Sequence, residues 1–391
     1  MSATETPTSR RRIFDDEHED FRQSIRRWLT NEVVPHFDDW EREGIVPREV
    51  FAAAGSNGFL ATQVPEEFGG AGVDDFRFNV VLGEECFRLS LGGFGVGLTL
   101  HNDVCLPYFL EYCNDEQKQR WLPGITDGTL ITAIAMTEPG TGSDLAGIKT
   151  KAIRDGDHYV VNGAKTFITS GVRADFVTTA VRTGGPGHGG ISLLVVEKGT
   201  PGFVVDRALA KMGWLCSDTA ELSFRDARVP VVNLVGEENS GFVQIAEQFV
   251  VERIALAVHA YGIAARSLAL TAAYCGQRET FGKPLAARQV VRHRLVEMHQ
   301  RVDVARTYTR SVAARHAAGE DVVAEACLAK NNAVEACSWV VDQAVQLHGG
   351  TGYMHGTEVE RHYRDARILP IGGGATEVLT DLAARLLGYA G

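Results

Sequence analysis

The sequence predicts an α+β protein whose helices and strands lie in separate domains. Residues 13 to about 127 carry apolar side chains at helical spacing, and residues 128 to about 240 carry short β-branched runs between glycine and proline turns. From residue 241 the pattern returns to long helical segments. This order is typical of segregated domains and not of βαβ units. Because 391 residues exceed what one core usually serves, we expect domains at 1–127, 128–240 and 241–391.

In the first domain, Phe21, Ile25 and Trp28 recur at three- and four-residue spacing, which places them on one face of a helix. A second helical stretch begins at residues 46–50, with Pro47 near its start. Residues 66–72 (EEFGGAG) have the composition of a loop between helices.

In the second domain, an apolar run at 130–134 predicts a strand, and further strands are predicted at 159–161, 191–196 and 220–224. The turns between strands are predicted at 155–157, 184–186 and 201–202. The third domain has helical segments from 241 to about 275 and at 285–318, 321–348 and 376–389.

Composition restricts the function. A net charge of −11 argues against a general nucleic-acid or anionic-membrane surface. Seven scattered cysteines without a CxxC pair predict free thiols in a reducing compartment, and twelve histidines without close ligand spacing predict no metal site. We expect no membrane span, because no apolar run appears long enough for one. The first residues lack the apolar core of a secretion signal, so the cytoplasm is the expected location.

Residues 135–147 (AMTEPGTGSDLAG) are the most informative segment of the chain. Three glycines allow backbone N–H groups to approach a ligand, and three hydroxyls can bind ring edges or phosphate oxygens. The glycines are Gly140, Gly142 and Gly147, and the hydroxyls are those of Thr137, Thr141 and Ser143. A glycine-rich turn after a strand is usually only a turn. The full thirteen-residue pattern, however, resembles the first signature of the acyl-CoA dehydrogenase flavoproteins.

That resemblance spans nearly the whole chain and is closest to the long-chain and isovaleryl types. It implies an N-terminal α-helical domain, a middle β-barrel domain and a C-terminal four-helix bundle, assembled as a homotetramer (a dimer of dimers). It also implies FAD as cofactor and a fatty or branched acyl-CoA thioester as substrate, oxidised to the trans-2-enoyl-CoA in fatty acid β-oxidation. Electrons would pass to an electron-transferring flavoprotein.

The same resemblance assigns cofactor contacts. Thr137 matches a residue at the flavin pyrimidine edge, Phe167 one against the isoalloxazine, and Thr169 one near N5. Arg278 and Thr280 match residues that hold the diphosphate of a neighbouring subunit's cofactor. The full cofactor set implied is Met136, Thr137, Gly142, Ser143, Phe167, Thr169, Arg278, Thr280, Phe281, Gln289, Gln346, Gly349, Gly350 and Glu377. Ser143, Arg253 and Gly373 are the implied substrate contacts.

The catalytic base is implied at Glu252, in a Glu252-Arg253 pair on the first helix of the last domain, as in the long-chain and isovaleryl members. The glycine-rich loop at 370–375, where many members carry the base, has no acid. Helical spacing independently places Glu252 in an apolar stripe with Phe249 and Leu256, where burial should raise its pKa. By resemblance, the Gly373 N–H binds the thioester oxygen, and Gly373 leaves room for Glu252. The alternative is a structural pairing of Glu252 with Arg253 or another bundle charge.

Two other functions stay open at this stage. One is a flavin-dependent acyl-CoA oxidase or monooxygenase of the same fold. The other is a non-catalytic partner subunit, because Gly356 and Ala375 depart from the family pattern and the loop lacks an acid. Trp214 is expected either to shield the flavin or to pack in the core. Gly93, Gly95 and Gly97 either keep an acyl pocket open or let helices pack closely.

Overall fold

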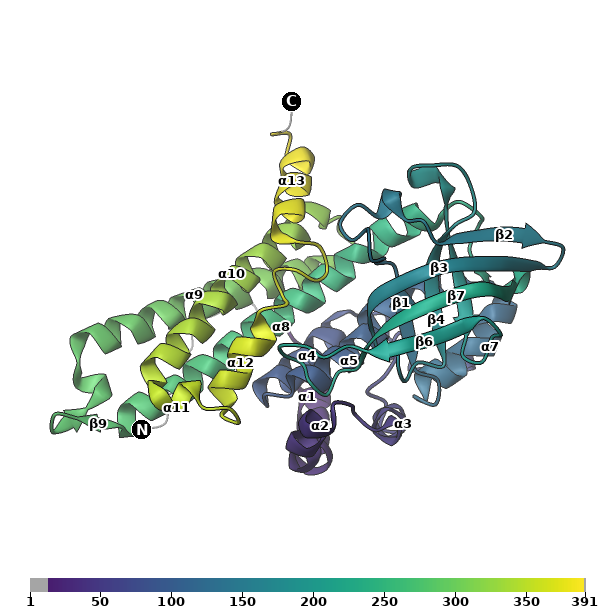
Figure 1. The fold of residues 1–391 in the computed structure, drawn as a ribbon. Coiled ribbons are helices and arrows are strands. Elements are labelled where there is room, and N and C mark those ends of the chain that lie inside the picture. Colours follow the sequence, from purple (N-terminus) through teal and green to yellow (C-terminus); the bar gives the residue numbers. More distant parts are fainter. Residues whose placement is uncertain (1–12, 390–391) are drawn as a thin grey trace.

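The computed structural model describes residues 13–389 and shows three regions along the chain. Helices come first, a β-sheet follows, and a bundle of long helices ends the chain (Figure 1). The sheet lies at one end of the molecule and the bundle extends to the other, with the N-terminal helices packed between and beneath them. The predicted fold class, helical domains flanking a middle β-domain, is confirmed.

From residue 13 to 127 the structure has seven α-helices. They are α1 (Asp16–Trp28), α2 (Phe37–Glu43), α3 (Arg48–Ser56), α4 (Arg77–Arg88), α5 (Gly92–Thr99), α6 (Leu106–Tyr112) and α7 (Asp115–Thr126). The predicted helix through Trp28 is α1, and Ile25 is fully buried on it. Pro47 precedes α3 with φ −58°, which its ring favours, so the second predicted helix begins where expected. The glycine-rich segment at 66–72 is a short 3₁₀ turn and loop.

The middle region forms one eight-stranded sheet. Its strands are β1 (Thr132–Ala135), β2 (Lys151–Asp155), β3 (His158–Thr169), β4 (Phe176–Arg182), β5 (Ile191–Glu197), β6 (Phe203–Ala208), β7 (Thr219–Pro230) and β8 (Leu234–Val235). The order is β6-β7-β3-β2-β4-β5-β8, and β1 pairs with β4 in parallel. The sheet curves around its apolar face (Figure 1). The predicted strands correspond to β1, β3, β5 and β7, and the predicted turn at 155–157 closes the β2–β3 hairpin with Gly156 at φ +63°.

The C-terminal bundle consists of α8 (Gly241–Gln277), α9 (Gln289–Ala317), α10 (Val323–His348) and α13 (Thr376–Leu386), with the shorter α11 (Gly350–Tyr353) and α12 (Glu358–Ala366) between α10 and α13. Helix α10 packs against α8, α9, α12 and α13. The expected helix at 285–318 begins later, at Gln289, because residues 279–284 form the hairpin β9 (Glu279–Thr280) and β10 (Lys283–Pro284).

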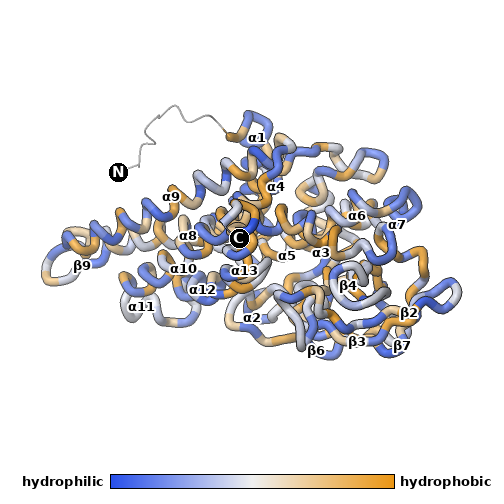
Figure 2. The backbone as a smooth tube through the Cα atoms, turned by 90° about the horizontal axis from the view of Figure 1, so that it is seen from above, coloured by the Kyte–Doolittle hydropathy of each residue, from blue (hydrophilic) through white to orange (hydrophobic). Residues whose placement is uncertain are grey.

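Helix α8 is the one helix among residues 13–389 that is long and apolar enough to cross a membrane by length and composition. The expectation that no apolar run approaches this length was therefore wrong. Within the protein, 61% of its most apolar window is buried, and it packs against α4, α9 and α10 as the central helix of a core. Figure 2 shows the hydrophobic segments gathered where the helices meet each other and the sheet. All seven cysteines are buried free thiols, as predicted.

Candidate active site

The signature segment 135–147 forms a tight turn directly after β1, as its composition predicts. The backbone N–H of Glu138 donates to the Thr141 carbonyl at 2.8 Å, and the N–H of Thr141 donates back at 3.1 Å. A Cβ at Gly147 would lie 3.1 Å from a carboxylate oxygen of Asp144, a close contact that the exposed Asp144 side chain would have to relieve by shifting. Gly142 and Ser143 are exposed and Thr137 is half-buried, which leaves their polar groups accessible to a ligand.

A buried ion pair fixes this turn to strand β3. The Lys165 ammonium lies 3.0 Å from Oε1 of Glu138 and donates to the Met136 carbonyl at 2.9 Å. Glu138 also accepts the backbone N–H groups of Lys149 and Thr150, at 2.7 and 2.8 Å. Burial lowers the pKa of Lys165 to about 8, although Glu138 acts in the opposite direction. The position of Thr137 relative to β3 therefore depends on a charged pair in the interior.

Phe167 on strand β3 has an unusual exposure and an unusual backbone conformation for an aromatic strand residue. Its side chain is 68% exposed, and its backbone adopts φ +61°, which costs a non-glycine residue roughly 1–2 kcal/mol. The register between β3 and β7 shifts between Lys165 and Ile168, so a bulge turns Phe167 out of the sheet. The Thr166 N–H donates to the Thr137 carbonyl at 3.0 Å, which places the bulge beside the signature turn. A strained backbone that exposes an aromatic ring indicates a binding role.

Phe167 and Thr169 line a cleft of about 350 Å³ between the sheet and the end of α12. Its other walls are residues 209–214, Thr219, Arg364, Arg367, Ile368 and Ile371. Trp214 faces this cleft and is half-buried, so it is not simply a core residue. Its backbone N–H donates to Oδ1 of Asp365 at 2.6 Å, and its ring stacks on His259 with centroids 5.1 Å apart.

Glu252 and Gly373 meet at the loop that also supplies Ile371 to the wall of this cleft. A Cβ built on Gly373 would lie 3.2 Å from Oε1 of Glu252 and 2.1 Å from Cδ1 of Leu256. Gly373 also has φ +61°, so both its space and its backbone favour glycine. The neighbouring loop residues Gly372, Gly374 and Ala375 add no acid, which leaves Glu252 as the carboxylate at this point.

Burial raises the pKa of Glu252, and the positive charges of Arg253 and Lys330 only partly oppose it. Within residues 13–389 its carboxylate makes no hydrogen bond or ion pair. The alternative, a structural ion pair with Arg253 or another bundle charge, is therefore not observed among these residues. Arg253 is instead buried, and its guanidinium lies 5.4 Å from the Phe249 ring centroid. A half-buried carboxylate without a partner can accept a proton from a ligand.

A second group of predicted residues lies at the far end of the bundle, away from the sheet (Figure 1). It comprises Arg278, Thr280, Phe281, Gln289, Gln346, Gly349 and Gly350, all on or beside the β9–β10 hairpin and α11. The Tyr274 and His348 rings stack with centroids 4.3 Å apart, which joins the end of α8 to the end of α10. Phe281 is 96% exposed. One chain therefore brings this group together but does not bring it to Phe167 and Glu252.

Glu377 lies in the first turn of α13, exposed to solvent, close enough to Lys330 to interact with its charge.

Sequence reasoning overlooked three buried ionisable groups at the site: Lys165, Lys330 and Asp365. The first two occur within apolar stretches of β3 and α10, a pattern that was available in the sequence. Asp365 lies on α12, a helix that the sequence did not predict.

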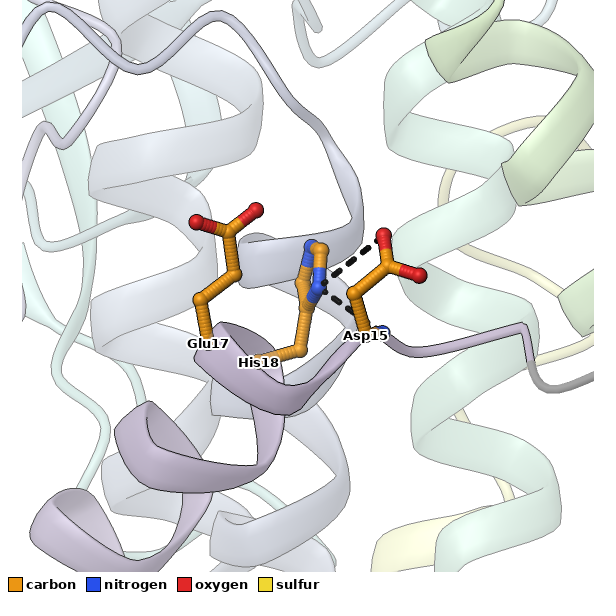
Figure 3. Close-up of side chains that lie close together, drawn as sticks. All are labelled: Asp15, Glu17 and His18. Atoms are coloured by element: carbon orange, nitrogen blue, oxygen red, sulfur yellow. Dashed lines mark hydrogen bonds and ion pairs between the residues drawn. The ribbon is translucent and has the colours of Figure 1, made fainter.

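One cluster outside this site has the composition of a metal site. Asp15, Glu17 and His18 offer ligand atoms within 4.8 Å of one another (Figure 3). However, Nδ1 of His18 accepts the Asp15 backbone N–H at 3.2 Å, and Nε2 donates to Oδ2 of Asp75 at 3.2 Å. Arg77 lies 3.0 Å from Oδ2 of Asp15. Since these interactions already occupy the imidazole and a carboxylate, the cluster serves the start of α1.

Family models match each of the three regions. The N-terminal domain model of acyl-CoA dehydrogenases matches residues 15–129, the middle domain model matches 133–227, and the C-terminal domain model matches 239–388. The long-chain specific acyl-CoA dehydrogenase of Sus scrofa mitochondria is 41% identical over 96% of this chain and 87% of that protein. A putative acyl-CoA dehydrogenase structure from Mycobacterium smegmatis is 52% identical, with TM-score 0.94 over 97% of this chain and 99% of that one.

Two further structures share the fold at lower identity. The FAD complex of PigA is 25% identical, with TM-score 0.92 over 97% of this chain and 99% of that chain. A chain from a structure described as the electron transferring flavoprotein of Acidaminococcus fermentans is 32% identical, with TM-score 0.92 over 96% and 98% of the two chains. Taken with the matches over all three regions, these relatives show that the chain belongs to the acyl-CoA dehydrogenase family and is an oxidoreductase of that family.

Proposed function

We propose that this enzyme is FAD-dependent and removes an α-proton and a β-hydride from a fatty or branched acyl-CoA, giving the trans-2-enoyl-CoA. One observation carries the proposal. The carboxylate of Glu252, without a hydrogen-bond partner and with a raised pKa, lies against Gly373, two residues along the loop from Ile371 in the wall of the cleft that Phe167 lines. A base and an exposed aromatic surface at one cleft fit proton abstraction next to a flat redox cofactor.

The residues present fit FAD. Phe167 offers an exposed aromatic face whose strained backbone is otherwise unexplained, and the cleft beside it is mostly apolar. Met136, Thr137 and Thr169 would hold the ring system, and Gly142 and Ser143 would hold the phosphate side with backbone and hydroxyl donors. When bound, FAD supplies the acceptor for the β-hydride. The side chains around it exclude water and orient the thioester.

Glu252 would take the α-proton onto a carboxylate oxygen. The high pKa that burial gives it strengthens it as a base, provided that it is ionised when substrate binds. The backbone N–H of Gly373 makes no hydrogen bond to any part of residues 13–389, so it can donate to the thioester oxygen. Negative charge develops on that oxygen as the proton leaves, and a fixed donor there lowers the barrier.

The acyl chain is expected to be long or branched, as in the long-chain relative. Gly93, Gly95 and Gly97 do not supply an open pocket for it. A Cβ on Gly93 would lie 2.7 Å from Sγ of Cys216, and one on Gly95 would lie 2.8 Å from the Phe87 ring. These contacts favour close packing of α5 over an open pocket. Arg253 is buried, so its proposed contact with substrate requires a ligand that reaches inside the bundle.

A second copy of the chain would complete the FAD site. Arg278, Thr280, Phe281, Gln289, Gln346, Gly349 and Gly350 lie too far along the bundle to serve their own chain's cleft (Figure 1). The exposed Phe281 and Tyr353 at this end suit an interface. We propose a homotetramer built as a dimer of dimers, located in the cytoplasm, with an electron-transferring flavoprotein as acceptor. The structural relative from Acidaminococcus fermentans supports that acceptor.

The test is anaerobic mixing of the FAD-loaded protein with a panel of acyl-CoA thioesters, read as loss of flavin absorbance. Bleaching by straight or branched acyl-CoA is expected. If no acyl-CoA bleaches the flavin, the dehydrogenase proposal fails and a non-catalytic subunit becomes the better account. The bleached protein is then mixed with air. Slow reoxidation is expected of a dehydrogenase, and fast reoxidation with peroxide release would instead identify an oxidase.

A further inference from the structure

Lys330 is a fully buried lysine in the first third of α10, and the proposed mechanism does not use it. Its neighbours on the buried side of the helix are small and apolar, including Ala326, Ala329 and Ala333. A buried ammonium without compensation is strongly destabilising. The interactions that offset the cost of burying the Lys330 ammonium therefore indicate its role.

The first contact is with the glycine loop. The Lys330 ammonium donates to the Gly374 carbonyl at 2.6 Å. Gly374 follows Gly373, whose missing side chain leaves room for Glu252. The next residue on α10, Asn331, donates to the Thr376 carbonyl at 3.0 Å. Helix α10 thus holds the end of the loop at two successive residues, but only Lys330 brings a charge to it.

The second contact is electrostatic. Lys330 and Glu252 are close enough that each shifts the other's titration: the cation favours the ionised carboxylate, and the carboxylate favours the ammonium. Burial lowers the pKa of Lys330 to about 8, so the side chain is still mostly protonated at neutral pH. The other groups that face Lys330 are Arg253, Cys327 and Glu377. Those that face Glu252 are Arg253 on its own helix and, from the segment before α7, Cys105 and Tyr108.

We propose that Lys330 is a positioning residue for the reaction: its ammonium fixes the Gly373–Gly374 backbone against Glu252 and keeps that carboxylate charged. This inference rests on the proposed function, because it needs Glu252 to act as the base. The charge on Lys330 offsets part of the rise in the Glu252 pKa that burial causes. The hydrogen bond from Lys330 to Gly374 fixes the position of the neighbouring Gly373 N–H. One side chain therefore connects the base to the donor for the thioester oxygen.

Three variants separate the effect of the Lys330 charge from the effect of its hydrogen bond to Gly374. Lys330→Met removes both the charge and the hydrogen bond at similar length, Lys330→Gln removes the charge and keeps a donor, and Lys330→Arg keeps the charge. Asn331→Ala is the matched control, since it removes the adjacent tether from α10 to α13 without changing a charge. Each FAD-loaded protein is titrated by infrared spectroscopy without substrate, following the carboxyl band that Glu252→Gln abolishes.

The expected result is a pKa of Glu252 raised by about one unit in Lys330→Met and Lys330→Gln, in line with loss of one nearby charge. Lys330→Arg and Asn331→Ala should stay near wild type. The acidic limb of the flavin-reduction rate should move by the same amount. If Lys330→Met gives no folded protein, Lys330→Gln decides the charge effect. An unshifted Glu252 pKa in the neutral variants, or an equal shift in Asn331→Ala, would overturn the inference.

The infrared titration also separates this inference from the function on which it rests. Should wild-type protein fail to reduce its flavin with any acyl-CoA, the proposed function is wrong, yet the titration still reports whether Lys330 controls the Glu252 charge. If the wild type reduces its flavin but the pKa of Glu252 is the same in the Lys330 variants as in the wild type, the proposed function stands and the inference fails.

Discussion

Oε1 of Glu252 lies 3.2 Å from the point where a Cβ on Gly373 would stand, so a glycine from the loop before α13 faces a carboxylate from α8. Lys330 of α10 holds the same loop through Gly374. Three elements of the bundle, distant in sequence, therefore meet at one carboxylate. Under the proposed function these elements have separate tasks: α8 carries the proton acceptor, the loop provides space and an N–H donor, and α10 fixes the loop.

Gly373→Ala should slow flavin reduction by at least about tenfold, which corresponds to roughly 1.4 kcal/mol in the barrier. The added methyl would stand 2.1 Å from Cδ1 of Leu256 and press on Glu252, at a backbone φ of +61°. Gly372→Ala is the matched control, because the nearest atom to its Cβ is 3.7 Å away. Stopped-flow flavin reduction measures both. Equal flavin-reduction rates in the two variants would mean that the site does not require a glycine at position 373.

Phe167→Gly should weaken FAD binding while it stabilises the protein without cofactor. The ring is 68% exposed and contributes little to the core, and glycine relieves a positive φ worth roughly 1 kcal/mol. FAD titration by fluorescence gives the affinity, and urea unfolding gives the stability. Ile153→Gly in β2, where the side chain is 67% exposed, is the control and should leave FAD affinity unchanged. If Phe167→Gly binds FAD as tightly as the wild type, the exposed Phe167 ring does not contact the cofactor.

Asp365 should make the protein less stable as pH rises from about 4 to about 7. Burial and the nearby Glu41 raise its pKa to about 7 from 3.8, so between these values the folded state binds more protons than the unfolded state. Stability then falls with pH by up to about 1.4 kcal/mol per unit for this one group. Asp365→Asn should remove that slope, and exposed Asp342→Asn should not. Urea unfolding at pH 5 and 7 tests this, and an unaltered slope in Asp365→Asn contradicts it.

Mixed assemblies should restore activity if two copies share each FAD site. A Glu252→Gln chain still offers Arg278 to its neighbour, and an Arg278→Ala chain still offers Glu252 to its own site. Each variant alone should be nearly inactive, whereas the two expressed together should recover activity in the sites that combine both intact residues. Glu252→Gln expressed with a second Glu252→Gln chain is the control. No recovery in a mixed assembly of proven composition would place Arg278 outside the shared site.

Much of the fold could be predicted from the sequence, because long amphipathic or apolar helices and well-buried strands leave a clear period. Helix α12 could not, since two of its four buried residues are His362 and Asp365, which look polar in a pattern search. Strands β2 and β6 were also not predicted. Their mostly exposed side chains give little apolar alternation. Strand β4 was not predicted either, although it is buried, because Thr178 and Thr179 interrupt its apolar run.

Part of the candidate site could be named from the sequence, and the limit has a physical cause. The signature turn and Glu252 could be named from their local patterns and the family resemblance. Their distances to partners could not, since Gly373 and Lys330 reach Glu252 only through the packing of α8, α10 and α13. Lysines such as Lys165 and Lys330 are normally assigned to the surface, so their burial is visible only in three dimensions.

The central claim is that Glu252 removes the α-proton. The most direct measurement is single-turnover flavin reduction, without oxygen, by the best acyl-CoA of the panel, comparing wild type with Glu252→Gln and with Glu247→Gln, an exposed glutamate on the same helix. We predict that Glu252→Gln binds FAD and acyl-CoA but loses flavin reduction by about 10³-fold or more, of the order expected when a positioned base is removed. Glu247→Gln should match wild type. Flavin reduction at the wild-type rate in Glu252→Gln would contradict the claim.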